Sequence, residues 1–195
     1  DDASQVNLKL ERKGDFVLHG DTGFSKKLRD SQQASYYYSQ PYIELSGQLI
    51  IDDQSIAVNG NGWFDHEWTS HYLVDGAEGW DWFSIHLNDN QKLMLFRMRH
   101  QQETDFWSGT YIDSTGQVHT LSEDQIRAEV VSKTLVRDRQ LPLNWSVSIA
   151  EHGLDLNIKP VRRDQWNQGL FSYYEGAITV DGSHSGVGFM ELTGH

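Results

Sequence analysis

The densest group of side chains able to do chemistry in this chain is the heptapeptide Gly-Trp-Phe-Asp-His-Glu-Trp. It contains the carboxylates of Asp65 and Glu67, the imidazole of His66, and the indoles of Trp63 and Trp68. A carboxyl group whose pKa is raised by loss of solvent can act as a general acid. Aromatic ring faces stabilise a cation that forms beside them. The heptapeptide therefore predicts acid chemistry on an apolar substrate, with its three titratable residues as the catalytic candidates.

Neighbouring side chains of an extended strand point to opposite faces, so a strand would divide the heptapeptide in two. Trp63, Asp65 and Glu67 would share one face, and His66 and Trp68 would share the other. A buried Asp–His pair that only fixes strand geometry through hydrogen bonds is the alternative, because structural networks also perturb titratable groups. Both interpretations of the heptapeptide stay open on the sequence alone.

A second aromatic stripe follows soon after the heptapeptide. Trp80, Trp82, Ser84 and His86 alternate with other residues and would share one face of a strand. Such a stripe either lines a ligand site or packs in a core, and the core is the commoner outcome. The residues predicted to contact a ligand, taken from both groups, are Trp63, Trp68, Trp80, Trp82 and His86.

Two further acids, Glu175 and Glu191, lie in apolar segments near the C-terminus. Each could face a cavity or pair with an arginine of another strand. Because a charge in an apolar strand needs a partner, we expect ion pairs with Arg97 or Arg99.

The residue types present in the chain exclude several kinds of catalytic and metal site. The chain has no cysteine, which excludes disulfides, thiolate metal sites and a cysteine nucleophile. It also lacks the spaced histidine pair of zinc hydrolases and the strained serine turn of α/β-hydrolases. We therefore predict no metal site and no cofactor.

The elements that must position these residues are predicted to be strands. Alternation of apolar and polar residues, the period of a half-buried strand, recurs along the chain. With 7 Trp, 8 Tyr and 8 Phe in 195 residues, the composition favours pleated sheet. A capping box at residues 122–125 predicts a single turn of helix. The predicted strands include residues 6–10, 43–51, 63–72, 80–87, 93–99, 107–112, 118–121, 145–149, 154–158, 173–180 and 187–192.

The predicted strands and the net charge narrow the possible fold class and the possible partners. Roughly a dozen strands at a spacing of about 8–12 residues is typical of an all-β, antiparallel barrel or sandwich. The formal net charge of −12 disfavours nucleic acid as a partner. No apolar run is long enough to cross a bilayer as a helix, so we expect a soluble protein without an integral membrane segment.

Several motifs, in their order along the chain, resemble the family that joins AttH-like predicted secreted hydrolases to the hydroxyneurosporene synthases, which are carotenoid 1,2-hydratases. They begin with His-Gly-Asp-Thr-Gly-Phe-Ser, and the chain is similar to the C-terminal part of such proteins. The resemblance implies an antiparallel lipocalin-like (calycin-type) barrel, with two such domains in tandem and a cleft between them. The matching motifs lie at residues 19–25, 34–41, 63–68, 79–84, 93–99, 174–177 and 188–194.

The same resemblance implies a division of the chain. Residues 1–75, which carry the heptapeptide, would be the remnant of a first lipocalin-like domain, with strands of an incomplete barrel. Residues 76–195 would form a C-terminal lipocalin-like domain. A missing N-terminal lipocalin-like domain is then the protein partner, and a secreted or periplasmic location is expected.

The hydratase branch of the family adds water to an acyclic carotenoid by protonating its terminal double bond and capturing the tertiary cation. The resemblance implies that His66 and Trp68 line the site. The proton-donating Asp of that branch corresponds to residues 95–98, where this chain has Leu-Phe-Arg-Met and no acid. That departure counts against hydratase activity unless Asp65 or Glu67 takes the role.

Ligand binding is therefore the leading expectation. We expect a lipocalin-like domain that binds a hydrophobic small molecule, an isoprenoid or a lipid, in a barrel or in a cleft between domains. The alternatives are a hydro-lyase or hydratase-like enzyme that protonates an isoprenoid double bond, and a secreted hydrolase of unknown substrate.

Overall fold

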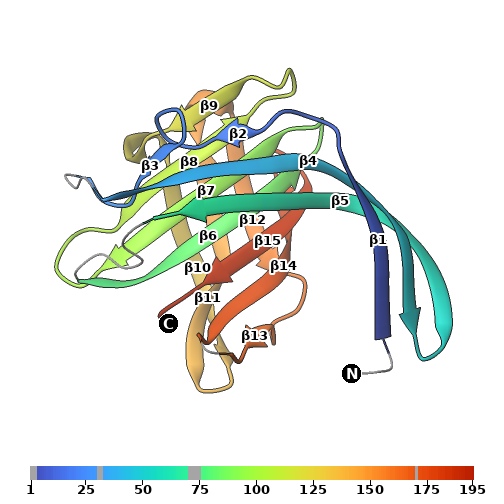
Figure 1. Cartoon of the computed structure of the whole chain (residues 1–195). Coiled ribbons are helices and arrows are strands. Elements are labelled where there is room, and N and C mark those ends of the chain that lie inside the picture. Colours follow the sequence, from blue (N-terminus) through green and yellow to red (C-terminus); the bar gives the residue numbers. More distant parts are fainter. Residues whose placement is uncertain (1–3, 30–32, 70–75, 170) are drawn as a thin grey trace.

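The computed structural model describes residues 4–29, 33–69, 76–169 and 171–195. Almost all regular structure in these residues is antiparallel strand, arranged in one five-stranded and one ten-stranded sheet (Figure 1). Two short 3-10 helices, η1 (Glu123–Gln125) and η2 (Ala150–His152), interrupt the strands. The predicted all-β, antiparallel, lipocalin-like fold class is thus confirmed. Among the described residues, no helix has the length and apolar character needed to cross a membrane.

The first sheet is built around one long strand, β4. Three shorter strands pair with successive stretches of one edge of β4, and β5 pairs with the other edge along nearly its whole length. The heptapeptide forms the end of β5. The strands are β1 (Ser4–Arg12), β2 (Val17–Leu18), β3 (Phe24–Lys26), β4 (Ala34–Ile51) and β5 (Gln54–Trp68).

The second sheet contains the remaining strands in the order β10-β11-β12-β14-β15-β6-β7-β8-β9, with β13 paired to β14. The strand that follows Gly76 therefore lies between the last strand of the chain and β7. Its members are β6 (Ala77–Leu87), β7 (Lys92–His100), β8 (Phe106–Ile112), β9 (Val118–Leu121), β10 (Arg127–Val136), β11 (Arg139–Ile149), β12 (Leu154–Pro160), β13 (Trp166–Asn167), β14 (Tyr173–Gly182) and β15 (Gly186–Leu192).

The concave side of the ten-stranded sheet is filled by the main hydrophobic core. Phe83, Ile85, Leu143 and Trp145 are each at most 1% exposed and belong to one packed cluster. The Phe83 and Trp145 rings meet edge to face with centroids 5.5 Å apart, a favoured aromatic geometry. Side chains thus occupy the interior of this sheet, as in small barrels whose lumen is packed.

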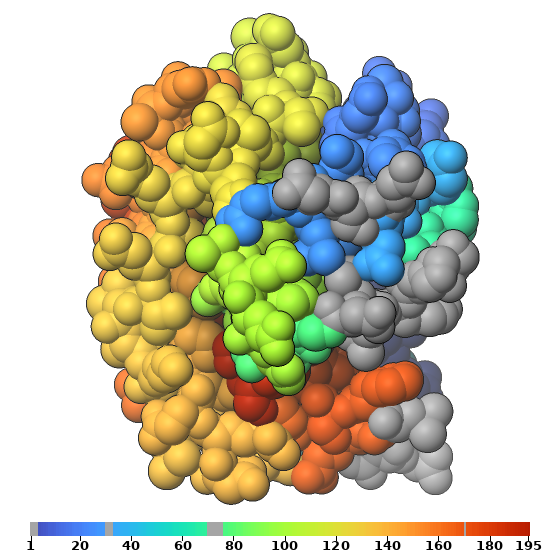
Figure 2. All heavy atoms as spheres, turned by 90° about the vertical axis from the view of Figure 1, so that its left-hand side faces the viewer, coloured from blue at the N-terminus to red at the C-terminus, as the bar shows by residue number. Residues whose placement is uncertain are grey.

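The five-stranded sheet lies across the opposite side of the ten-stranded one, and a second, smaller cluster packs between them. This cluster contains Tyr37 of β4 and Met94, Phe96 and Met98 of β7. In Figure 2 the blue N-terminal residues lie directly against green and yellow residues of the larger sheet. Polar contacts hold this junction, among them Thr120 Oγ1 donating to the Gly20 carbonyl at 3.2 Å.

One side of the five-stranded sheet, which we call its outer face, points away from the larger sheet. Between Gln40 and Ile43 the β4–β5 register shifts, as at a β-bulge. The shift transfers the outward position in β4 from even to odd residues, so the outer face stays apolar along the whole strand. Its exposed large apolar side chains include Val6, Leu10, Tyr36, Ile51, Ile56, Phe64 and Trp68.

The predicted domain division stays a prediction. The strands of the five-stranded sheet end at Trp68, and those of the other sheet begin at Ala77. The boundary expected at residues 74–78 begins outside the described residues, as does the end of the strand expected over residues 63–72. The predicted turn of helix is confirmed as η1, where the Ser122 N–H donates to Gln125 Oε1 at 2.9 Å.

The core assignment makes a stability prediction. Leu143 is 0% exposed, whereas Leu135 on the neighbouring strand β10 is 62% exposed. Leu143→Ala should lower the free energy of unfolding by about 2–5 kcal/mol, because it removes buried methyl groups and leaves a cavity. Leu135→Ala, the same chemical change in solvent, should cost less than about 0.5 kcal/mol. Urea titration of both variants measures the difference, and equal losses would contradict this placement of the core.

Candidate functional site

A cavity of about 880 Å³ lies between the two sheets. Aromatic side chains make up much of its wall, and acids from both sheets face it. The residues from the five-stranded sheet include Tyr37, Trp63, Asp65 and Glu67. Those from the ten-stranded sheet include Trp80, Trp82, His86, Phe96, Glu175 and Glu191.

Asp65 is the acid with the most donors. Its Oδ1 accepts from Tyr37 Oη at 2.7 Å, from Trp63 Nε1 at 3.0 Å, and from the Ser39 hydroxyl. Burial raises the pKa of Asp65, the three donors oppose that rise, and the charge of Glu67 adds to it. Every hydrogen bond recorded for Asp65 among the described residues ends on Oδ1, so Oδ2 is the oxygen left for a proton or a ligand.

Tyr37 joins this acid to the facing sheet. Its hydroxyl donates to Asp65 and accepts from Trp82 Nε1 at 3.0 Å. Burial, and then the nearby Asp65 charge, raises the pKa of Tyr37 well above its ordinary value. The phenol therefore stays protonated at neutral pH and remains a donor to Asp65.

Glu67, two residues along the same strand face, has a different environment. Lys27 forms an ion pair with it, and the Ser35 hydroxyl donates to it. The Lys27 ammonium also lies 4.3 Å from the centroid of the Phe96 ring, in cation–π range. Glu67 thus carries its own counter-charge at the cavity wall, whereas the partners of Asp65 are all neutral donors.

The two C-terminal glutamates face this cavity and not the arginines. Glu191 Oε1 accepts from Trp80 Nε1 at 2.8 Å, and burial raises the pKa of Glu191. Glu175 accepts from the Tyr173 hydroxyl at 2.9 Å. The expected ion pairs with Arg97 or Arg99 are therefore wrong, because a different carboxylate takes both arginines.

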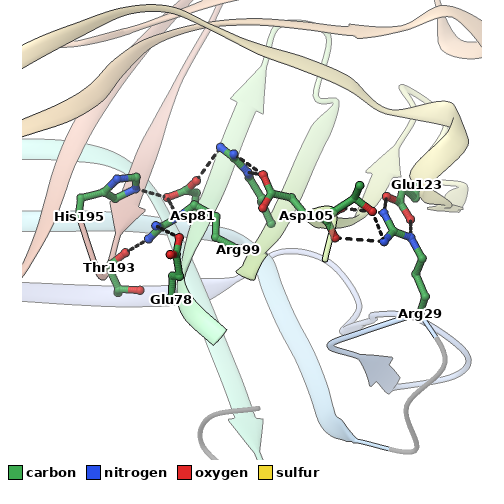
Figure 3. Close-up of polar contacts among 10 residues, drawn as sticks. Arg29, Glu78, Asp81, Arg99, Asp105, Glu123, Thr193 and His195 are labelled. Carbon is green, nitrogen blue, oxygen red and sulfur yellow. Dashed lines mark hydrogen bonds and ion pairs between the residues drawn. The ribbon is translucent and has the colours of Figure 1, made fainter. Parts of the chain in front are cut away.

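That carboxylate is Asp81, which lies between Arg99 and His195 in Figure 3. It is 0% exposed. Arg97 Nη1 lies 3.2 Å from its Oδ2, and Arg99 Nε lies 3.6 Å from its Oδ1. His195 Nε2 lies 2.7 Å from the same Oδ1. Arg97 also pairs with Asp105. The network lies on the core side of β6, away from the cavity.

The second aromatic stripe lines the cavity. Trp80, Trp82, Ser84 and His86 all face it, while the residues between them point into the core. The His86 ring meets the Trp63 ring edge-on, with centroids 5.6 Å apart. Burial, and then the charge of Lys92, lowers the pKa of His86 to about 4. At neutral pH this imidazole is uncharged.

The heptapeptide is divided between two faces, as alternation along a strand requires. Trp63, Asp65 and Glu67 line the cavity, and His66 does not. The His66 Nδ1 lies 3.2 Å from the Tyr38 hydroxyl on the outer face. Trp68 borders the cavity, but its indole stacks on Tyr36 of the outer face with centroids 5.5 Å apart.

The segment that corresponds to the proton-donating strand of the hydratases also alternates. Phe96 and Met98 line the cavity, while Arg97 points to the Asp81 network. The cavity acids therefore come from β5, β14 and β15. Among the described residues, no group of three or more His, Asp and Glu side chains has an arrangement able to hold a metal ion.

Sequence reasoning missed the residues that surround Asp65. Tyr37 and Ser39 lie opposite Glu67 and Asp65 in the β4–β5 register, and His19 reaches Ser39 from outside the strands. Alternation identifies one face of one strand, but it does not say which strands pair. A prediction of the β4–β5 hairpin and its register would have been needed to place these hydroxyls beside Asp65 and Glu67.

The fold and the cavity together define a lipocalin-like domain. The sequence profile of the AttH-like family matches residues 1–195, and the chain belongs to this family.

Solved structures agree with this assignment. A crystal structure assigned as an AttH from Nitrosomonas europaea has 32% identity and a TM-score of 0.89, covering 98% of this chain and 62% of that one. Kievitone hydratase from Nectria haematococca has 18% identity and a TM-score of 0.78, covering 99% of this chain and 62% of that one. The chain thus spans less than two thirds of the length of either protein. No curated protein sequence matches it significantly.

The partly buried His86 gives a pH prediction. Its pKa of about 4 lies below the ordinary histidine value, so the unfolded chain binds more protons than the folded one between about pH 6.5 and 4. Stability that is present above pH 6.5 is therefore lost as the pH falls through that window. His86→Gln should flatten this dependence, with up to about 1.4 kcal/mol per pH unit removed for one proton.

The measurement is urea unfolding at several pH values. His184→Gln, the same substitution in the loop between β14 and β15, is the matched control because it leaves His86 in place. An unchanged slope in His86→Gln would mean that the imidazole is not buried in its uncharged form.

Proposed function

We propose that this lipocalin-like domain binds a hydrophobic small molecule, an isoprenoid or a lipid, in the cavity between its sheets. The observation that carries the proposal is the cavity itself, about 880 Å³ in volume with a wall rich in tryptophan. This volume is typical of sites for ligands of that size. Because core side chains fill the concave side of the larger sheet, the space between the sheets is the better candidate than the barrel interior.

The charges on the wall favour an uncharged ligand. Asp65, Glu67, Glu175 and Glu191 face the cavity, with Lys27 as a counter-charge for Glu67. A ligand carboxylate placed among these acids would meet like charges in a poorly solvated space, which is costly. An isoprenoid alcohol or another neutral lipid avoids that cost, so we propose this class ahead of fatty acids.

The binding proposal is tested by closing the cavity. Ala177 faces it, so Ala177→Phe should fill part of the space and weaken binding of farnesol or oleyl alcohol by roughly tenfold or more. The readout is saturable quenching of tryptophan fluorescence, because several tryptophans line the wall. Mass spectrometry of an organic extract of the purified protein identifies any molecule that is already bound.

The matched control is Ala57→Phe, the same substitution on an exposed position of β5 away from the cavity. It should bind like the wild type. An empty extract together with no saturable quenching by either alcohol would overturn the binding proposal. Equal weakening by both substitutions would locate any bound ligand outside this cavity.

The second candidate is an enzyme that adds water to an isoprenoid double bond. It is favoured by Asp65, a partly buried acid with a raised pKa beside the Trp63 indole. The fold similarity to kievitone hydratase is compatible with it but, at 18% identity, bears on the fold alone. A secreted hydrolase is less supported, because no activated nucleophile is found among the cavity residues named above.

The reaction would proceed in two steps. Asp65 would give the proton on Oδ2 to one alkene carbon, which leaves a tertiary cation on the other and a carboxylate on Asp65. The rings of Trp63 and Trp82 would stabilise that cation. Water would then add its oxygen to the cation, and the proton released from it would restore the acid. The net change is one water added across one double bond.

The outer face is the competing location for such chemistry. Tyr38, His66 and Trp68 gather their rings there, with the His66 and Trp68 centroids 5.1 Å apart. This is the face that the family resemblance implies for the catalytic imidazole. We propose that a further lipocalin-like domain would have to cover it, since exposed rings alone do not exclude water.

Two substitutions distinguish the locations. If the cavity holds the reaction, Asp65→Asn should reduce hydration of an acyclic isoprenoid at least about a hundredfold, because an amide cannot donate the proton. His66→Ala should then leave turnover near wild type. Loss of activity in His66→Ala alone would move the chemistry to the outer face. The assay is formation of the tertiary alcohol, followed by gas chromatography.

Folding is the control for both variants. Each should keep the wild-type circular dichroism spectrum and urea midpoint within error. If both variants instead unfold, the heptapeptide has the structural role that its sequence left open. Absence of turnover in the wild type on every acyclic isoprenoid tested would remove the enzyme candidate and leave the binding proposal.

A further inference from the structure

His19 is a buried imidazole that neither proposed function uses. It follows β2 and is 1% exposed. Its Nε2 lies 2.6 Å from Ser39 Oγ, and its Nδ1 lies 2.8 Å from Thr110 Oγ1. Thr110 and Ser39 are equally buried, at 1% and 0% exposed. The ring also packs on Tyr37, with centroids 4.1 Å apart.

The contacts of His19 form a chain that ends at Asp65. The Ser39 hydroxyl donates to Asp65 Oδ1. Since a hydroxyl has only one proton, Ser39 must accept from His19, which therefore carries a hydrogen on Nε2. Burial, and then the charge of Lys27, lowers the pKa of His19 to about 3, so the ring is uncharged at neutral pH. Its Nδ1 is then bare and accepts from the Thr110 hydroxyl.

The hydrogen bonds therefore all run in one direction, from Thr110 through His19 and Ser39 to Asp65. Each group in the chain uses its donor for the next one, and the final acceptor is Oδ1. Thr110 lies on β8 of the larger sheet, whereas Ser39 lies on β4. The chain of hydrogen bonds thus connects the face of the larger sheet that meets the smaller one to the cavity wall formed by β4 and β5.

We infer that His19 is a positioning residue for Asp65, holding the Ser39 hydroxyl on Oδ1 so that Oδ2 is the oxygen that carries a proton toward the ligand. The role of that proton in catalysis rests on the proposed function. The hydrogen-bond relay itself is a property of the unliganded protein. Its removal should change the ionisation of Asp65 even though no relay member except Ser39 contacts the carboxyl group.

Other charges act on the same groups and stay constant in the test. The charge of Glu67 raises the pKa of Asp65, and the charges of Asp65 and Glu67 act on Glu191 across the cavity. Lys27 lies near His19 and Glu67. Variants at Thr110 and Ser39 alter none of these charges, so a change in titration reports the relay.

The experiment compares Thr110→Val with Thr110→Ser. Valine has nearly the shape of threonine but no hydroxyl, so His19 loses the donor that fixes its protonated nitrogen. The ring can then accept from Ser39, which withdraws the Ser39 hydroxyl from Asp65. The pKa of Asp65 should rise, because a donor to the charged form is lost. Serine restores the hydroxyl and should restore the wild-type titration.

The readout is the carboxyl ¹³C shift of Asp65 across a pH series, with ¹⁵N shifts of the His19 ring to identify its protonated nitrogen. Ser39→Ala removes the final donor directly and should raise the pKa of Asp65 at least as much as Thr110→Val. In the wild type, His19 should be neutral and protonated on Nε2 near neutral pH.

The relay is overturned if Asp65 titrates alike in wild type and Thr110→Val, whatever the effect of Ser39→Ala, or if His19 carries its proton on Nδ1. Both measurements use unliganded protein, so they do not depend on ligand binding. If Asp65 responds to both variants while the protein binds neither alcohol, the relay stands and the proposed function fails. If the protein binds the alcohols but Asp65 does not respond to Thr110→Val, the cavity remains a binding site and His19 has no role in positioning Asp65.

Discussion

The register of the strands that form one wall of the cavity depends on a carboxylate that water cannot reach. Asp81 is 0% exposed, and a charge in that position is tolerated only when it is fully paired. Its partners come from two separate parts of the chain: Arg97 and Arg99 from β7, and His195 from the C-terminal residues. Each partner has a second anchor. Arg97 also pairs with Asp105, Arg99 also donates to the Thr193 backbone oxygen, and the His195 backbone oxygen accepts from Arg139 at 3.0 Å. These strands must therefore adopt one register for the network to be complete.

The position of Asp81 on β6 determines which residues reach the cavity. Because successive side chains alternate, a strand that turns Asp81 toward the core must turn Trp80 and Trp82 to the other side. Those indoles then meet partners from distant segments, Glu191 on β15 and Tyr37 on β4. Tyr37 in turn donates to Asp65, so a constraint in the core of the larger sheet extends to the acid on the smaller one. The cavity lies between the face of β6 that carries Trp80 and Trp82 and the face of the smaller sheet that carries Tyr37 and Asp65.

Much of the fold could be predicted from the sequence because period-two alternation is a local signal. It divided the heptapeptide correctly between two faces, and it grouped Trp80, Trp82, Ser84 and His86 on one side of a strand. It could not show that this side faces a cavity, since a core stripe has the same pattern. The partners of Glu175 and Glu191 were also beyond it, because Asp81 competes for the arginines and its burial depends on strand order. The hydroxyls around Asp65 depend on the β4–β5 register, which no local pattern specifies.

A comparison of two aspartates that accept similar numbers of hydrogen bonds shows why Asp65 is the candidate proton donor. Asp113, in the loop after β8, accepts from the Thr115 hydroxyl at 2.6 Å, from the Thr115 N–H at 2.9 Å and from the Gln117 N–H at 3.0 Å. These bonds, with His119, hold the pKa of Asp113 far below its ordinary value. Asp65 also has three donors, yet its pKa moves in the opposite direction.

The difference between the two aspartates is loss of hydration, which is the largest influence on the pKa of Asp65 and a lesser one on that of Asp113. A carboxylate that keeps most of its hydration gains further stabilisation of its charged form from added donors. In the cavity wall, loss of water outweighs the same number of donors, and the charge of Glu67 adds to the effect. The donors of Asp65 therefore do not fix it as an anion. They limit how far the pKa rises and direct where the proton sits, which is what a group that both donates and recovers a proton requires.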